Sequence, residues 1–164
     1  NSTTGYHLQW PKKNSTHCPG WVDHYILEGA REVKIRRSIE KRMKDLEGSG
    51  RGCFYEREEE GQILFSTHLE EGRLDIYING FAFGVEGRMR KLLFSEVVRI
   101  VSHLSIEMFS SAGDQGDLDF YVPLDVECES LNVTLSVPFL AYSNIMNILL
   151  GLREDWIKRD YSDG

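Results

Sequence analysis

The sequence predicts an α+β fold in which a bent antiparallel sheet of about seven strands lies between an N-terminal helix and a closing C-terminal amphipathic helix. Three observations predict this class. Residues 24–47 are rich in helix formers and contain no proline. Residues 53–94 change to short apolar runs of period two, separated by turns that contain glycine. After Pro138, apolar residues recur at helical spacing.

The chain length of 164 residues is that of one domain with a single hydrophobic core. Residues 1–20 are predicted to be an irregular N-terminal arm, because glycine and proline alternate there with polar residues. Residues 21–164 are predicted to be one α+β domain, with a helix at 21–47 and the sheet and closing helix at 52–157. The longest apolar runs are too short to span a bilayer.

The first helix is predicted to begin after Asp23, whose side chain can cap it, and to end at the glycines 48 and 50. One stripe is apolar and would face the core: Ile35, Ile39, Met43 and Leu46. Two i,i+4 pairs are predicted to support the exposed surface: Glu32 with Arg36, and Glu40 with Lys44.

Five short strands are predicted next: Cys53 to Arg57, Gln62 to Leu69, Leu74 to Ile78, Phe81 to Val85 and Lys91 to Phe94. Asn79-Gly80 is a strong signal for a tight hairpin turn, because glycine adopts the positive φ that such turns need. Consecutive hairpins imply antiparallel pairing, since parallel neighbours require long crossovers.

Residues 95–109 are ambiguous between helix and strand, although their β-branched residues favour a strand. Two further strands are predicted at 118–127 and 131–137, and Pro123 suggests an edge strand or a bulge in the first of them. Pro138 can open the final helix. Its apolar stripe is Ala141, Ile145, Ile148, Leu149, Leu152 and Trp156.

Three widely spaced cysteines, Cys18, Cys53 and Cys128, match no zinc or redox motif, and their odd number is typical of free thiols in a reducing compartment. Asn1, Asn14 and Asn132 each begin an Asn-x-Ser/Thr glycosylation sequon, which leaves a secretory location open. Asn132 falls in a predicted strand, and we interpret all three as incidental. A cytoplasmic location is therefore expected.

The net charge is −7, and its distribution predicts a partner. No Lys or Arg occurs from Ile100 to Leu152. That segment carries seven acids: Glu107, Asp114, Asp117, Asp119, Asp125, Glu127 and Glu129. Such a surface repels phosphate backbones, which disfavours nucleic-acid binding. It would instead attract another protein with a basic surface, so these seven residues are the predicted docking face. The oligomeric state is left open.

No motif of nucleophilic, metal-dependent or phosphate-binding catalysis is present, so we expect no catalytic residues and no cofactor. His7, His17, Cys18 and His24 lack the paired spacing of a zinc site. The aspartates 114, 117 and 119 lack the calcium-loop pattern. No metal is expected. An enzyme whose pocket is assembled from distant residues remains a third hypothesis.

Residues 52–157 resemble the pleckstrin-homology superfold, including its bacterial and GRAM-like relatives. The resemblance lies in the strand pattern of residues 74–83 (LDIYINGFAF) and 91–97 (KLLFSEV), followed by a closing helix. It implies a bent seven-stranded sheet. Lipid-binding relatives carry basic residues in the first hairpin loop, whereas this chain has glutamates at 58–60.

The favoured hypothesis is a non-catalytic protein-binding module, such as an inhibitor, an immunity-type protein or a scaffold domain, that docks through its acidic face. The alternative is a membrane-associated module that uses basic residues of the first helix (Lys34, Arg36, Arg37, Lys41 and Arg42) and the turn residues Arg88, Arg90 and Lys91. Three charges in one turn are few for stable attachment, so membrane binding is not expected.

Overall fold

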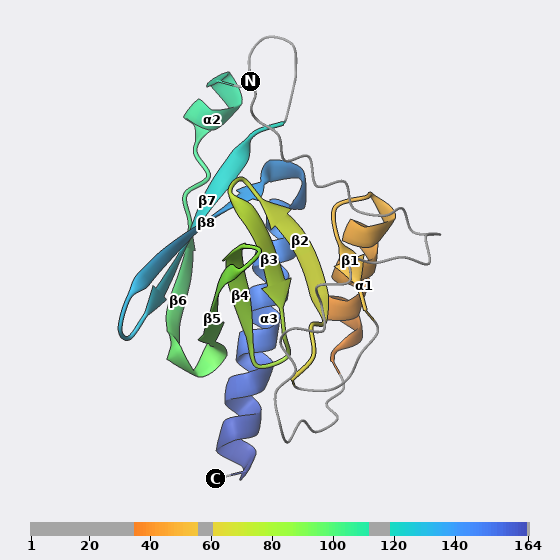
Figure 1. The fold of residues 1–164 in the computed structure, drawn as a ribbon, viewed down its shortest axis with the longest axis vertical. Helices are drawn as coiled ribbons and strands as arrows, with labels where there is room; N and C mark the ends of the chain where they lie inside the picture. Colours follow the sequence, from red (N-terminus) through yellow and green to blue (C-terminus); the bar gives the residue numbers. More distant parts are fainter. Residues whose placement is uncertain (1–34, 56–60, 112–118, 164) are drawn as a thin grey trace.

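A computed structural model describes residues 35–55, 61–111 and 119–163 of the chain (Figure 1). Three α-helices, one 3-10 helix and eight strands lie in these ranges. In chain order they are α1 (Arg37–Gly48), β1 (Cys53–Phe54), β2 (Phe65–Leu69), β3 (Gly72–Ile76), β4 (Gly80–Val85), β5 (Arg88–Leu93), η2 (Phe94–Glu96), β6 (Val97–Ser102), α2 (Ile106–Ser111), β7 (Tyr121–Cys128), β8 (Asn132–Pro138) and α3 (Phe139–Asp163). The α+β class is confirmed.

All strand pairs are antiparallel, as expected from consecutive hairpins. They form two sheets, one in the order β1-β2-β3-β4-β5 and one in the order β6-β7-β8. The one bent sheet predicted from the sequence is thus two. The chain passes between them through η2, and the Glu70 N–H donates to the Ser136 carbonyl at 3.0 Å, which joins the end of β2 to β8.

One hydrophobic core is shared by both sheets, α1 and α3. The long helix α3 packs on α1, η2, β7 and β8. It therefore contacts the first helix described as well as the last two strands (Figure 1). Five residues of its predicted apolar stripe are fully buried: Ala141, Ile145, Ile148, Leu149 and Leu152. Trp156 packs against them while remaining partly exposed. The prediction of a core-closing last helix is confirmed.

Helix α1 begins later than the sequence predicted. Ile35 and Arg36 are not helical, and Arg36 is an extended N-cap residue with φ −64° and ψ 145°. Its carbonyl accepts the N–H groups of Ile39 and Glu40 at 3.1 and 3.0 Å, which fixes the first turn. The remainder of the predicted helix, residues 21–34, lies outside the described residues. The predicted ion pair between Glu40 and Lys44 is confirmed at 3.0 Å.

The turn at Glu86-Gly87 is a tight hairpin turn, with Val85 paired to Arg88 and Gly87 at φ 87°. A hairpin joins β3 to β4 at Asn79-Gly80, as predicted, but the reason given for the glycine is wrong. Gly80 opens β4 without a positive φ, and the Tyr77 N–H donates to its carbonyl at 2.8 Å. Glycine is required there because a Cβ would collide with the Leu92 carbonyl oxygen on the neighbouring strand β5.

The ambiguous segment 95–109 divides into η2, the strand β6 and the short helix α2. Pro123 does not mark an edge, because β7 is the central strand of its sheet. The Pro123 carbonyl accepts the His103 N–H at 3.0 Å, so the proline nitrogen faces the same side. On that side β6 ends at the pair of Ser102 with Leu124. Because proline has no N–H, it cannot donate the reciprocal bond to the His103 carbonyl, and the ladder between β6 and β7 stops there.

The cysteines differ from the prediction of three free thiols. Cys53 is disulfide-bonded, whereas Cys128 is free and buried. Burial raises the pKa of the Cys128 thiol, with a smaller contribution from Glu96. In the described part of the chain, no helix combines the length and the apolar character needed to cross a membrane.

Candidate functional site

The three-stranded sheet has one buried and one outward face. Along β7, residues 122, 124, 126 and 128 are buried and the residues between them are partly exposed, as strand alternation requires. The outward positions include Asp125 and Glu127, two acids of the predicted docking face. Thr134 of β8 and Arg99 of β6 lie opposite them. The outward face is therefore lined by charged and polar side chains that neighbouring strands bring together.

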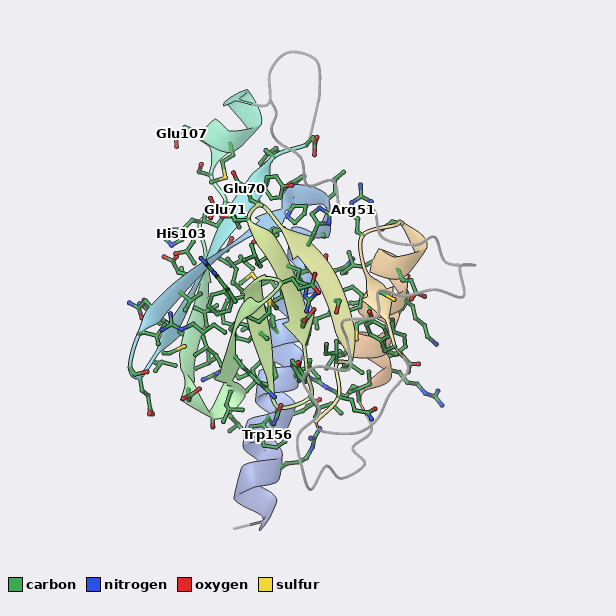
Figure 2. All side chains as sticks on the ribbon, in the orientation of Figure 1. Arg51, Glu70, Glu71, His103, Glu107 and Trp156 are labelled. Atoms are coloured by element: carbon green, nitrogen blue, oxygen red, sulfur yellow. The ribbon has the colours of Figure 1, made fainter. Side chains whose placement is uncertain are left out.

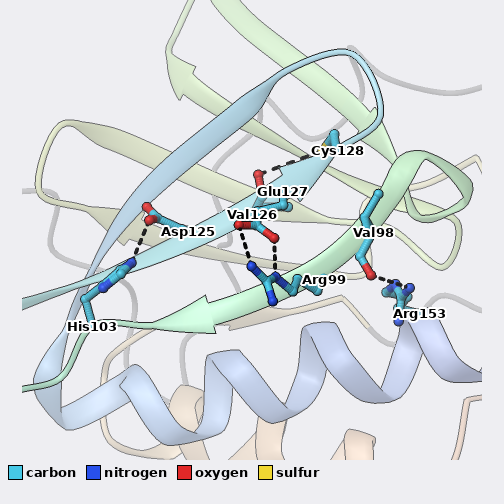
Figure 3. A network of polar contacts seen from close by, with 8 residues as sticks. All are labelled: Val98, Arg99, His103, Asp125, Val126, Glu127, Cys128 and Arg153. Carbon is cyan, nitrogen blue, oxygen red and sulfur yellow. Dashed lines mark hydrogen bonds and ion pairs between the residues drawn. The ribbon is translucent and has the colours of Figure 1, made fainter.

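Glu127 is paired with a cation that the sequence reasoning missed. Arg99 Nη2 donates to Glu127 Oε1 at 3.1 Å, and Arg99 Nε donates to Glu127 Oε2 (Figure 3). The hydrogen bonds from Arg99 lower the pKa of Glu127. Arg99 lies one residue before the segment that has no Lys or Arg. Cross-strand pairing, which the sequence does not reveal, places it beside Glu127.

Asp125 is held from both neighbouring strands. Thr134 Oγ1 donates to Asp125 Oδ1 at 2.7 Å. On the other side, His103 Nε2 lies 2.6 Å from Asp125 Oδ2 (Figure 3). The hydrogen bond from Thr134 lowers the pKa of Asp125 most, and the contact with His103 lowers it further. The carboxylate is consequently fixed in orientation and stays ionised at neutral pH.

The remaining predicted acids fall at two ends of the sheet. Glu107 on α2 and Asp119 before β7 are exposed at one end, whereas Glu129 is exposed beyond the other end of β7. At about 3.3 Å per strand residue, Asp119 and Glu129 are roughly 30 Å apart along the chain direction. Asp114 and Asp117 lie outside the described residues. The five described acids thus extend along the sheet and do not surround one point.

An apolar surface accompanies the acids at the first of these ends. Helix α2 projects from the body of the molecule (Figures 1 and 2). Ile106 at its start is 83% exposed, and Leu104 before it is 37% exposed. Large apolar side chains exposed together beside charged groups are typical of interaction sites. We name this surface the α2 end and define it by Leu104, Ile106, Glu107, Asp119 and Asp125.

A cavity of about 250 Å³ lies between β2 and the starts of β7 and α3. Its polar lining includes Arg51, His68, Asp119 and Tyr121, and the first residues of α3 close it. Burial and the Arg51 guanidinium lower the pKa of His68, against an opposing effect of Asp119. Burial, Asp119 and Glu70 raise the pKa of Tyr121.

At neutral pH this cavity therefore presents a neutral imidazole and a protonated phenol beside one cation and one carboxylate. These groups include hydrogen-bond donors and acceptors, so together they can bind a small polar molecule. These four side chains come from three separate segments of the chain, and the start of α3 adds a fourth segment to the lining. Of these four residues only Asp119 was singled out from the sequence, as an acid of the docking face, and the sequence gave no reason to join Asp119 to Arg51, His68 or Tyr121.

The basic residues of the membrane hypothesis are not gathered on one surface. Arg88 and Arg90 are exposed on β5, whereas the Lys91 ammonium group lies over the Tyr77 ring on the other face, 4.0 Å from the ring centroid. On the first helix, Arg36 binds Asp155 and Arg42 donates to Asn144, so both connect α1 to α3. Lys34 lies outside the described residues.

Comparisons of the chain with protein-family models, with curated proteins and with solved structures found no match. The site must be interpreted from its own geometry.

Proposed function

We propose that the protein is a non-catalytic binding module that docks another protein through the α2 end. The observation that carries this proposal is Ile106, which is 83% exposed on a projecting helix and is followed directly by Glu107. An exposed isoleucine gains roughly 1.5–3 kcal/mol when a partner buries it completely. That gain is available only if a partner presents an apolar pocket.

The acids of the α2 end support a partner with a basic rim. Asp119 and Glu107 are exposed, and Asp125 is held ionised by Thr134 and His103. A fixed carboxylate loses little conformational entropy when it meets a cation, so it contributes to orientation as well as attraction. An inhibitor, an immunity-type protein and a scaffold domain all fit this chemistry.

We further propose that the architecture is similar to the pleckstrin-homology superfold. Seven strands, β2–β8, followed by α3 support this proposal, and the Glu70–Ser136 bond brings the first and last of them together. This assignment differs from the one made from the sequence, because β6 takes the place of β1 among the seven strands. Helix α1 and β1 are then additions, and the first hairpin loop becomes Glu70-Glu71, both exposed, instead of residues 58–60. Two carboxylates there oppose a phosphorylated headgroup. An experimental structure in which β2 and β8 do not meet would contradict the alignment.

The docking proposal is tested with the partner that the protein captures from the lysate of its source. Surface plasmon resonance should then show a faster off-rate for Ile106→Ser. The double variant Glu107→Gln with Asp119→Asn should show a slower on-rate, and its difference from the parent protein should become smaller at high salt. Val98→Ser and Glu129→Gln are matched controls, because both residues are exposed away from the α2 end. Unchanged kinetics in the first two variants would contradict the proposal.

The membrane-associated module has less support, because Arg36, Arg42 and Lys91 have the intramolecular contacts described above. Co-sedimentation with vesicles that contain anionic lipids is the discriminating measurement. Pelleting that depends on lipid charge and is abolished by Arg88→Gln with Arg90→Gln would favour this alternative over protein docking.

A further inference from the structure

We propose that Asn132 is an N-glycosylation site and that the protein folds in the secretory pathway. Asn132 opens β8, directly after the turn that joins it to β7. Asn132 and Thr134 are exposed, whereas Val133 between them is buried. Strand alternation thus puts both recognition residues of the Asn-x-Thr sequon on the outward face of the sheet. The start of β8, where Asn132 lies, is at the end of the sheet away from α2 (Figure 1).

The geometry leaves room for a glycan. Within the described part of the chain, no hydrogen bond or ion pair engages the Asn132 amide. Attachment of an oligosaccharide at this position would extend the side chain into solvent without displacing a core residue. The buried side of the same strand, Val133, Leu135 and Val137, would be unaffected. The folded protein can therefore carry the modification at no cost in packing.

The number of sequons exceeds what chance gives. Three of the six asparagines begin one, although Ser and Thr together make up only 19 of the 164 residues. At that frequency about one asparagine in nine would begin a sequon by chance. A single sequon can easily occur by chance. Three of them together are harder to explain as incidental.

The cysteines give an independent argument. Disulfides persist in oxidising compartments, and Cys53 is disulfide-bonded. The free Cys128 is buried, and its raised thiol pKa leaves little thiolate to exchange with that disulfide. A paired cysteine and a shielded one suit the compartment in which asparagine glycosylation occurs, and they favour it over the expected cytoplasmic location.

The reaction requires a lipid-linked oligosaccharide pyrophosphate as donor, supplied with a membrane oligosaccharyltransferase. The Asn132 amide nitrogen forms a bond to the anomeric carbon of the first sugar and loses one proton. The bond between that carbon and the pyrophosphate oxygen breaks, and the lipid pyrophosphate leaves with the electron pair. No oxidant or reductant is needed.

The test begins with protein isolated from its natural source. Peptide-N-glycosidase treatment in heavy-oxygen water, followed by peptide mass spectrometry, should convert Asn132 to heavy-oxygen Asp. Conversion would support the proposal, and an unmodified Asn132 in all copies would overturn it. Alkylation before reduction should leave Cys53 unlabelled. Full labelling of Cys53 in the native protein would overturn the argument from the compartment.

Variants expressed in the same source identify the site. Asn132→Gln and Thr134→Ala should each lose one glycan-sized step in gel mobility, whereas Thr134→Ser should keep it. Asn147→Gln is the matched control, since Asn147 is exposed on α3 but begins no sequon. If Asn132→Gln migrates as the parent protein does, the proposal is overturned. Asn132→Gln also keeps this test separate from the docking proposal, because Asn132 pairs with Glu127 and not with a residue of the α2 end. Thr134 donates to Asp125, so its variants are used for the glycan readout alone.

Discussion

Arg36 and Asp155 form an ion pair that joins the entry of α1 to the second half of α3, with 2.9 Å between Arg36 Nε and Asp155 Oδ2. The same guanidinium donates through Nη2 to the Gly151 carbonyl at 3.1 Å. One side chain therefore satisfies two acceptors on a helix 119 residues away in sequence. The N-cap residue of α1 is thus anchored to α3 by its side chain.

We expect Arg36→Gln to lower the free energy of unfolding by about 0.5–1 kcal/mol, a value discounted because the Arg36 side chain is about half exposed. Lys41→Gln is the control, because the pair of Lys41 with Asp45 is local and exposed on both sides. Its loss should be under about 0.5 kcal/mol. Urea unfolding measures both, and equal losses would show that the contact with α3 adds nothing.

Gly151→Ala should fail to stabilise the protein, although alanine is favoured in helices by about 1 kcal/mol. A Cβ at Gly151 would lie 2.9 Å from Ile39 Cδ1, so the two helices would have to separate or Ile39 would have to move. Thermal unfolding of Gly151→Ala, Ile39→Val and the double variant tests this explanation.

Because Ile39→Val removes the obstructing methyl group, the double variant should be more stable than the sum of the two single effects predicts. Additive effects would mean that the close approach of α1 and α3 does not limit the residue at position 151.

Leu149→Ala should lower the free energy of unfolding by about 2–5 kcal/mol, because Leu149 is completely buried in the shared core. Leu140 lies on the same helix and is 51% exposed, so Leu140→Ala is the matched control, with an expected loss under about 0.5 kcal/mol. Chemical unfolding of both proteins gives the comparison. A small loss for Leu149→Ala would place this face of α3 outside the core.

The pKa of His68 should report the charges that line the cavity. Burial, and then Arg51, lower its folded pKa below 6.5. In the window between the folded pKa and 6.5 the unfolded chain binds more protons, so stability falls as the pH drops through it. An NMR titration of the imidazole should show a higher pKa in Arg51→Gln and a lower one in Asp119→Asn. Arg88→Gln is the control, and identical shifts in all three variants would argue against direct electrostatic contact.

Periodicity predicted most strands and the buried stripe of α3, since these depend on local alternation of apolar and polar residues. The contact of Arg36 with Asp155 could not be predicted, because the two residues are 119 positions apart in sequence. The division into two sheets was missed because it is a matter of which strands pair, and the alternation of apolar residues is the same in one sheet or in two.

The candidate site was less predictable. Acid content indicated a docking face, but the sequence could not show that Arg99 and His103 stand beside Glu127 and Asp125. Nor could it show that Ile106, apolar and apparently suited to a core, would be exposed on α2. The cavity combines side chains from four segments, a relationship that only the tertiary fold creates.

The packing of α1 on α3 also has a consequence for the nascent protein. Ile39, Met43 and Leu46 leave the ribosome roughly a hundred residues before the helix that covers them. At the usual rate of synthesis that delay lasts about 5–20 s. Until then, the part of the α1 stripe that packs on α3 has no partner, and a holdase chaperone can bind it.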